Sequence, residues 1–380
     1  MTDRQVQANV RLLSPPPERT EPVTVLDSLP DRPSAALVWE ACGAAGLIEG
    51  LYGRAGHVVP GRLAELLAAV DTRGDNGVTL SVLVQAASAL PVLAAGAPDS
   101  GPVRAALGHV RSGAATLALA ATDRAAAGSD LADLGTEVTI GLDELVLNGG
   151  KRWITTACTA RYLLVLARHR PGRHFTSFTW VLVPADAPGA RITRADTDLL
   201  TGADTGHIEF RDVRLPPDHL VGRPGRGMVA FAQHMGTERL AGALWAVALT
   251  SRVLADTKER LTRRHVDGRP LWHNASVRQR FAACLVQVAQ LDALCDSLGD
   301  RVAGHHDLAA AAVLKSAVGL VVDPVLAVCA QLQGADGLLR DGAQRIRSEA
   351  AVFAIGGGVS ELVLDTVADH ADALLTELRT

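Results

Sequence analysis

The chain has 380 residues, a formal net charge of −4 and 48% hydrophobic residues. A chain of this length exceeds the size at which one hydrophobic core usually keeps growing, so we expect two or three packed regions. Its basic residues are scattered rather than gathered in one segment, which argues against a nucleic-acid-binding protein.

The ends and the apolar segments of the chain argue against export and membrane insertion. The start, MTDRQVQANV, has no apolar stretch of the kind that signal peptides carry, so we expect a cytoplasmic protein. The most apolar segment, Leu308 to Leu332, is interrupted by Lys315, Asp323 and Pro324, so we expect no membrane span. The five cysteines form no CxxC pair, which argues against disulfides and a bound metal.

Residues 1–114 predict an N-terminal helical domain with an extended arm. From about Pro33 to Ser112, apolar residues recur at intervals of three and four, the spacing of one face of a helix. The preceding segment, LLSPPPERTEPV, is rich in proline and polar residues, which favours an extended arm over a packed element.

Residues 115–223 predict a middle antiparallel β domain. Short runs rich in β-branched residues follow one another, including TLALAAT, TEVTI, YLLVLARH and FTWVLVPA. Asn148-Gly149-Gly150 and Pro188-Gly189 supply turn residues between such runs.

Residues 224–380 predict a C-terminal four-helix bundle. Helical periodicity extends over residues 226–264, 276–304, 307–333 and 343–372. Four long amphipathic helices pack naturally as a bundle. The order of helix, sheet and helix therefore predicts an α+β fold with three regions.

One carboxylate, Glu238, lies on an apolar stripe of the helix that begins near Arg226. Apolar surroundings disfavour the ionised form and raise a carboxyl pKa toward neutrality, where a general base works well. Glu238 is therefore our candidate base, with a salt bridge to an arginine of a neighbouring helix as the alternative. The stripe consists of Met228, Phe231, Met235, Glu238, Gly242, Trp245 and Leu249.

Two segments of the β domain could contact a flat, polar ligand. LALAATDRAAAGSD places Thr122 and Ser129 on a small-residue loop, whose backbone N–H groups could meet a polar ring or a pyrophosphate. LNGGKRWITTA places Trp153 and Thr155 on one side of a strand, because strand side chains alternate. An ordinary loop and a core tryptophan are the alternatives.

Taken together, these segments resemble the acyl-CoA dehydrogenase family over about residues 34–372. The resemblance implies a helical domain, a middle β domain and a four-helix bundle, with FAD between sheet and bundle. It also implies a homodimer or a dimer of dimers, in which FAD reaches a neighbouring subunit. The segments are ATDRAAAGSD, LNGGKRWITTA, GADTGHIEFRDVRLP, Glu238-Arg239, RRHVDGRPL, QLQGADG and IGGGVSEL.

The resemblance assigns six residues to FAD. Three would contact the flavin ring, one would reach the pyrophosphate across the subunit interface, and two would support the adenosine half. A fixed positive charge at the pyrophosphate would offset its negative charges. In that order, the residues are Thr122, Trp153 and Thr155, then Arg264, then Gln331 and Gly334.

The resemblance also places the catalytic base on the first long helix of the bundle. Most family members carry the catalytic glutamate at the position of Gly357, whereas a subset matches Glu238 followed by Arg239. Glu238 would take the α-proton while the β-hydrogen leaves as hydride to flavin N5, and the Gly357 N–H would polarise the thioester carbonyl. Ser129, Met235, Arg239 and Gly357 are the expected substrate contacts.

The expected substrate is an acyl thioester of coenzyme A or of an acyl carrier protein. The expected electron acceptor is electron-transfer flavoprotein or oxygen. Asp267, Ala275 and Val359 depart from the family pattern where the ADP half of FAD would lie. A flavin-free structural paralogue, a flavin oxidase and a non-redox biosynthetic enzyme on the same fold therefore remain as alternatives.

Overall fold

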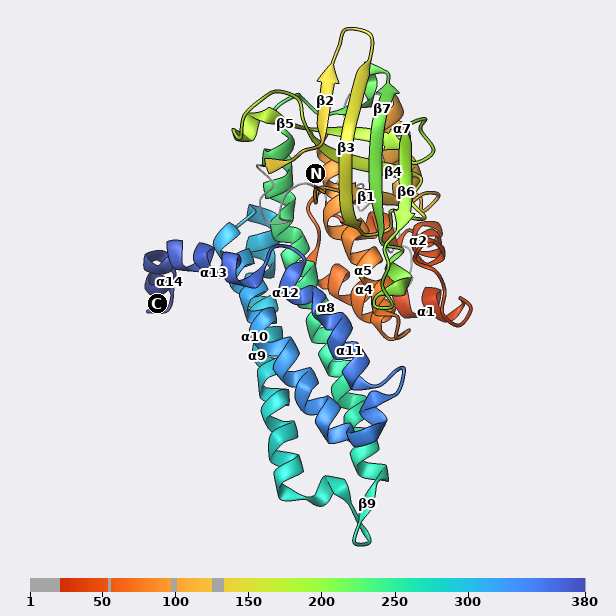
Figure 1. Ribbon diagram of the computed structural model, residues 1–380. Helices are drawn as coiled ribbons and strands as arrows, with labels where there is room; N and C mark the ends of the chain where they lie inside the picture. Colours follow the sequence, from red (N-terminus) through yellow and green to blue (C-terminus); the bar gives the residue numbers. More distant parts are fainter. Residues whose placement is uncertain (1–20, 54–55, 97–100, 125–132, 380) are drawn as a thin grey trace, which may run out of the picture.

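The computed structural model describes residues 21–53, 56–96, 101–124 and 133–379, which form a helical, a β and a second helical region in chain order (Figure 1). The expected fold class is confirmed. Ser129 and most of the proline-rich arm lie outside the described residues. Within that arm we expected an extended chain up to Val23, but Pro22 and Val23 begin helix α1 (Pro22–Asp27), because proline suits the first helical turn.

The N-terminal helices pack against both the sheet and the bundle. One hydrophobic core cluster contains Leu67 of this region, Leu117 of the first strand and Leu240 of the bundle. A five-residue π-helix, η1 (Gln85–Ala89), interrupts the buried helical stretch near its middle. The helices are α2 (Ala35–Ala44), α3 (Leu47–Gly50), α4 (Pro60–Asp71), α5 (Asn76–Val84), α6 (Leu90–Ala95) and α7 (Gly101–Arg111).

The middle region is a sheet with the strand order β6-β7-β3-β2-β4-β5-β8. Most neighbours are antiparallel as expected, but β1 pairs with β4 in parallel, and β2 makes one parallel pairing with β4. A parallel neighbour needs a long connection, which the chain between β1 and β4 provides. The strands are β1 (Leu117–Ala120), β2 (Glu137–Ile140), β3 (Leu145–Ile154), β4 (Tyr162–Arg168), β5 (Phe178–Pro184), β6 (Ala190–Arg194), β7 (Gly206–Leu215) and β8 (Leu220–Val221).

Three long helices form the body of the C-terminal region: α8 (Gly227–Arg263), α9 (Ala275–His305) and α10 (Leu308–Gln333). A hairpin of β9 (His265–Val266) and β10 (Arg269–Pro270) joins α8 to α9 at the end of the bundle that is remote from the sheet (Figure 1).

The prediction of one continuous fourth helix is wrong. The segment is divided into α11 (Ala343–Ala350), α12 (Val352–Ile355), α13 (Ser360–Asp369) and α14 (Ala371–Glu377). Three consecutive glycines separate α12 from α13, and Gly357 and Gly358 have φ values of 71° and 105°. Glycine adopts such angles without steric cost, so the helix ends there.

Among the described residues, three helical stretches are long and apolar enough to cross a membrane by length and mean hydropathy, and the bent pair Ala343–Ile355 and Ser360–Asp369 would be a fourth if it formed one span. The three stretches are Asn76–Ala95, Ala275–His305 and Leu308–Leu338, and their apolar windows are 78, 28 and 50% buried inside the fold. The first of them therefore uses most of its apolar surface to contact the rest of the chain. The absence of a membrane span stays a prediction.

A buried carboxylate, Asp71 at the end of α4, joins two of the regions. Asp71 is 1% exposed. Its Oδ1 accepts a hydrogen bond from Trp245 Nε1 at 2.9 Å, and its Oδ2 accepts one from Arg252 Nε at 2.6 Å. Arg252 also donates to Asn76 Oδ1, and Asn76 Nδ2 donates to Glu349 Oε2 at 2.7 Å. The network therefore extends from α4 through α8 to α11.

We expect Arg252→Ala to lower the free energy of unfolding by about 3–5 kcal/mol, because it leaves the Asp71 carboxylate buried without a counter-charge. Arg263 on the same helix is the matched control, since it pairs with Glu259 at the surface. Arg263→Ala should cost less than about 1 kcal/mol. Urea unfolding of the two variants measures the difference, and equal losses would contradict the role of Asp71.

Candidate functional site

Glu238 lies half-buried on α8 and is bound by a serine from another region. Ser88 Oγ donates a hydrogen bond to Glu238 Oε2 at 2.5 Å. Burial raises the pKa of Glu238, while Ser88, Arg239 and Lys315 act in the opposite direction. No ion pair joins Glu238 to a cation among the residues that the structure describes. The salt bridge considered above is therefore not formed among the described residues, and burial still raises the pKa of the carboxyl.

The Gly357 segment lies against the same carboxylate. A Cβ atom added at Gly357 would stand 4.0 Å from Glu238 Oε1. Arg239 Nε donates to the carbonyl oxygen of Gly357 at 2.9 Å, and Lys315 Nζ donates to that of Phe353. The helix position and the loop position expected for the base therefore meet at one point.

From the sequence we did not predict that two further residues, Ser88 and Lys315, lie in this cluster. Lys315 is buried, and burial lowers its pKa to about 8, as does Arg239, whereas Glu238 raises it. The available signal was similar for both residues: a polar side chain inside a mainly apolar helical segment. Met235 is half-buried on α8, three residues before Glu238.

Trp153 stands exposed near the end of β3. Its side chain is 56% exposed, which excludes the alternative of a core tryptophan. The φ angle of Trp153 is 56°, and the pairing of β3 with β7 is irregular between Lys151 and Ile154. We predicted that Trp153 and Thr155 lie on one side of this strand, because strand side chains alternate. However, β3 ends at Ile154, so the alternation does not extend to Thr155. Thr155 lies half-buried in the following turn.

Thr122 lies beside the same end of β3. Its carbonyl oxygen accepts a hydrogen bond from the N–H of Arg152 at 3.1 Å. The next residue, Asp123, forms a buried ion pair with Lys151 at 3.2 Å. Asp123 therefore fixes the backbone at Thr122 against β3 and brings Thr122 and Trp153 together.

Arg264 and Gly334 lie together at the far end of α8. A Cβ atom at Gly334 would approach Arg264 Nη1 to 2.8 Å, so the guanidinium lies directly against this glycine. A cavity of about 450 Å³ there is lined by three arginines and one acidic residue, Asp336, beside apolar and amide side chains. The arginines are Arg260, Arg263 and Arg264. The exposed Gln331 instead accepts a hydrogen bond from Arg280.

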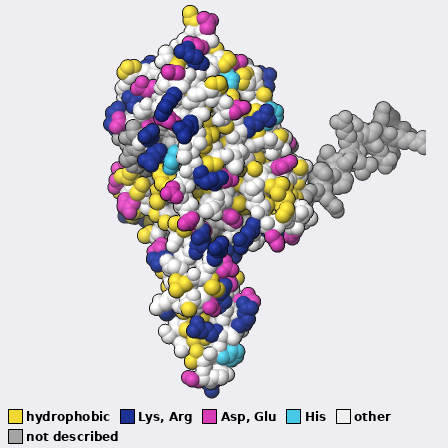
Figure 2. Space-filling view, turned by 45° about the vertical axis from the view of Figure 1, so that its right-hand side comes forward, with side chains coloured by type: hydrophobic (Ala, Val, Ile, Leu, Met, Phe, Trp, Pro, Cys, Tyr) yellow, Lys and Arg dark blue, Asp and Glu magenta, His cyan; other side chains and the backbone are white. Residues whose placement is uncertain are grey.

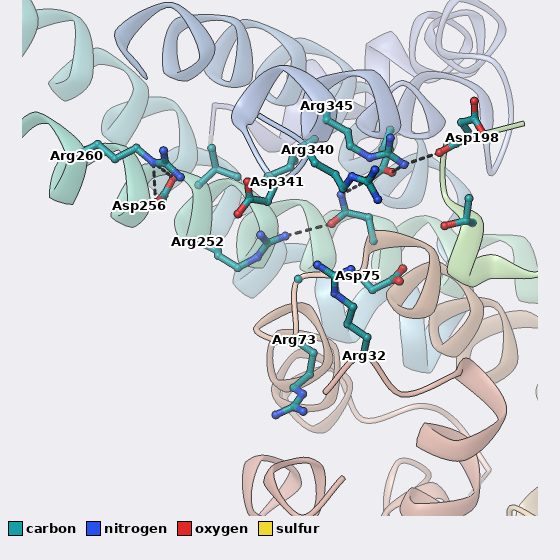
Figure 3. Close-up of a pocket in the computed structure, with 16 residues that line it drawn as sticks. Arg32, Arg73, Asp75, Asp198, Arg252, Asp256, Arg260, Arg340, Asp341 and Arg345 are labelled. Carbon is teal, nitrogen blue, oxygen red and sulfur yellow. Dashed lines mark hydrogen bonds and ion pairs between the residues drawn. The ribbon is translucent and has the colours of Figure 1, made fainter. Parts of the chain in front are cut away.

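A second cavity, larger than the one at Arg264, is a polar cleft of about 840 Å³ between α5, α8 and α11 (Figure 3). Six arginines and five acidic residues line it, and none of the predicted site residues is among them. Many of these charges pair with one another, as Arg260 does with Asp256 at 2.9 Å and Arg345 with Glu349 at 3.2 Å. We interpret the cleft as a seam of ion pairs between regions. Basic and acidic side chains are likewise interspersed over the face in Figure 2.

Three histidines gather near the site. The rings of His57 and His234 stand 5.4 and 6.0 Å from that of His306, centroid to centroid. His234 precedes Glu238 by one turn of α8. Burial, together with the neighbouring His306 and His57, lowers the pKa of His234 to about 4.

Family models match most of the chain beyond the N-terminal helices. Residues 118–213 match the middle domain of acyl-CoA dehydrogenases, and residues 225–371 match their C-terminal domain.

Relatives and solved structures agree with these matches. The acyl-[acyl-carrier-protein] dehydrogenase MbtN of Mycobacterium sp. (strain MCS) is 29% identical over 67% of this chain and 66% of its own length. The probable acyl-CoA dehydrogenase FadE2 of Mycobacterium tuberculosis is 29% identical over 62% of this chain and 58% of its own. The matches thus span less than two thirds of either relative.

Among solved structures, a probable acyl-CoA dehydrogenase of Mycobacterium abscessus superposes with a TM-score of 0.83 at 24% identity, over 94% of this chain and 99% of that one. At this level of identity, the likeness establishes the fold.

The histidine cluster predicts a loss of stability in mild acid. The unfolded chain binds a proton at His234 near pH 6.5, but the folded chain binds it only near pH 4, so stability is full above pH 6.5 and falls toward pH 4. The free energy of unfolding should decrease between pH 7 and pH 5, and we expect His234→Gln to make this decrease smaller by about 2 kcal/mol. Urea unfolding at both pH values, with the exposed His265→Gln as control, tests this. Identical pH dependence in both variants would contradict it.

Proposed function

This chain belongs to the acyl-CoA dehydrogenase family, and we propose that it is an FAD-dependent oxidoreductase that removes hydrogens from the α and β carbons of an acyl thioester. The proposal rests above all on the carboxylate of Glu238, which meets the Gly357 segment at the point where this family positions its base. Gly357 itself has no side chain that could accept a proton.

We propose the following roles for the residues of the chain. Glu238 accepts the α-proton, since burial raises the pKa of its carboxyl toward the working range of a general base. The Gly357 N–H donates to the thioester carbonyl as enolate charge develops. Arg239 and Lys315 hold the carbonyl oxygens of Gly357 and Phe353, so the donor stays in place. Bound FAD supplies the acceptor for the two electrons that leave with the β-hydrogen.

The residues present fit such a cofactor at two places. The exposed ring of Trp153, which packs edge-on against His207, offers a flat apolar surface beside Thr122. The arginine-lined cavity at Arg264 and Gly334 suits a pyrophosphate, because fixed cations there can offset its charges.

These two places point to a shared cofactor site between subunits. Helix α8 is continuous from Glu238 to Arg263, and a rise of 1.5 Å per residue separates Glu238 from Arg264 by about 39 Å. One dinucleotide beside Glu238 cannot extend so far within a single chain. We therefore propose a homodimer or a dimer of dimers in which Arg264 serves the cofactor of its neighbour.

The acyl carrier and the electron acceptor belong to the same proposal. The similarity to MbtN, which is named for a carrier-protein substrate, and to FadE2, which is named for coenzyme A, supports either thioester. We propose electron-transfer flavoprotein or oxygen as the acceptor. Asp267 lies in the turn of the hairpin that follows Arg264, and Ala275 begins α9 after it. Their departure from the family pattern bears on retention of FAD.

We expect purified protein to be yellow and Glu238→Gln to keep that colour. Loss of the base should slow flavin reduction by a good acyl thioester at least about a hundredfold, the lower range of general base catalysis. Stopped-flow absorbance under anaerobic conditions measures this rate, with the exposed Glu259→Gln on the same helix as control. A colourless protein, or a wild-type rate in Glu238→Gln, would contradict the proposal.

A second glutamate tests whether the two positions are equivalent. In the Glu238→Gln background, Gly357→Glu should restore part of the rate, because both positions face the same point. Recovery should be incomplete, since a side chain at φ 71° costs roughly 1–2 kcal/mol.

Arg264→Ala tests the site between subunits. We expect it to lower FAD occupancy while the fold persists, because it removes one of the cations at the cavity. Flavin content after dilution and gel filtration measures the effect, and Arg347→Ala, at an exposed ion pair with Asp323, is the control. Full occupancy in Arg264→Ala at high dilution would show that the contact is not used.

A further inference from the structure

The short π-helix η1 lies in the interior, and all five of its residues, Gln85–Ala89, are buried. A π-turn carries one residue more than an α-turn, so it rotates the side chains that follow relative to the preceding helix. Such turns occur frequently at functional sites. Here the turn directs a hydroxyl, that of Ser88, at the carboxylate of Glu238.

Two neighbours fix η1 in place. Gln85 exchanges two hydrogen bonds with the backbone of Leu117 in β1, its Nε2 donating to the carbonyl and its Oε1 accepting from the N–H. The hydroxyl of Tyr52 donates to the carbonyl oxygen of Ala86 at 2.7 Å. With both sides anchored, the direction of Ser88 is set by the fold rather than by the serine itself.

The two oxygens of Glu238 have different surroundings. Oε2 accepts the hydrogen bond from Ser88, whose residue is 2% exposed, so the donor of this bond is buried. Oε1 faces the Gly357 segment, where an added Cβ would lie 4.0 Å away. One oxygen is therefore held, and the other faces the place proposed for the substrate.

We propose that Ser88 is a positioning residue that binds Oε2 of Glu238, keeps the carboxylate ionised and leaves Oε1 to accept the proton. This inference rests on the proposed function. A donor to the ionised form favours that form over the protonated one, and a bond to a charged acceptor is stronger than one between neutral groups.

Other charged groups around the carboxylate are few. Arg239 and Lys315 face it from α8 and α10, and His234 lies one turn before it. The segment from Gly356 to Gly358 carries no titratable side chain. Arg239 and Lys315 donate to main-chain carbonyls, so within the described part of the chain Ser88 is the side chain that binds the carboxylate directly.

The test compares two serines of the same buried helical stretch. Ser88→Ala removes the bond to Glu238, and Ser81→Ala removes a hydroxyl that bonds to Thr156 instead. In Ser88→Ala we expect flavin reduction to slow about tenfold or more at neutral pH. The acidic limb of its pH profile should move up by about one pH unit or more, because the ionised base loses its donor. Ser81→Ala should leave the limb in place.

A second measurement does not depend on turnover. Carbon-13 NMR of protein with labelled glutamate carboxyls follows the titration of Glu238, identified by the resonance that Glu238→Gln lacks. The pKa of Glu238 should rise in Ser88→Ala, and should rise less in Ser88→Cys, which keeps size and a weak donor. If Ser88→Ala does not fold, Ser88→Cys carries the test.

The outcomes separate this inference from the proposed function. An unchanged Glu238 titration in the Ser88 variants overturns the positioning role, whatever the enzyme does. A wild-type rate in Glu238→Gln overturns the proposed base, and the role assigned to Ser88 in proton transfer falls with it. A raised Glu238 pKa without a shift in the acidic limb overturns the catalytic consequence of the bond.

Discussion

The buried carboxylate of Asp71 is the constraint on which the assembly of the three regions depends. A charge in the interior has to be compensated, and here the compensation comes from another region, through Arg252 and Trp245 of α8. Arg252 also donates to Asn76, which in turn donates to Glu349. Glu349 accepts a further hydrogen bond from the N–H of Leu200 in the β domain. The helical domain, the bundle and the sheet are thereby fixed relative to one another.

The residues of this network lie on the same chain segments that contact the candidate site. Glu349 lies on α11, and only a few residues later the chain presents the carbonyl oxygens of Phe353 and Gly357 to Lys315 and Arg239. On the other side, η1 continues the helix that begins at Asn76 and carries Ser88 to Glu238. The same network thus anchors both segments that contact the candidate base, the one that carries Ser88 and the one that carries Gly357. Each of these segments is connected to a helix that the network holds.

Helical periodicity and runs of β-branched residues together predicted the fold class. The apolar stripe of α8 and the family motifs together singled out Glu238. Prediction failed where the backbone departs from regular geometry. Strand alternation does not reach Thr155, because Trp153 adopts a positive φ and β3 ends at the next residue. A helical wheel of residues 76–95 with α-helical spacing does not give the direction of Ser88, because the π-turn at Gln85–Ala89 changes the spacing of the side chains there. The buried Lys315 pairs with a carbonyl from a remote segment, which sequence spacing does not reveal.

The location of the proposed base on α8 has a structural consequence for the glycine segment. A glutamate at Gly357 would sit on a turn with φ 71°, a conformation that is unfavourable for any residue with a Cβ. Glu238 occupies a regular helix that is packed along its length, and catalytic geometry is held more closely on such an element than on a loop. With the carboxylate on the helix, the Gly356–Gly358 segment has only to offer main-chain groups, and glycine can turn tightly enough to do so against Arg239.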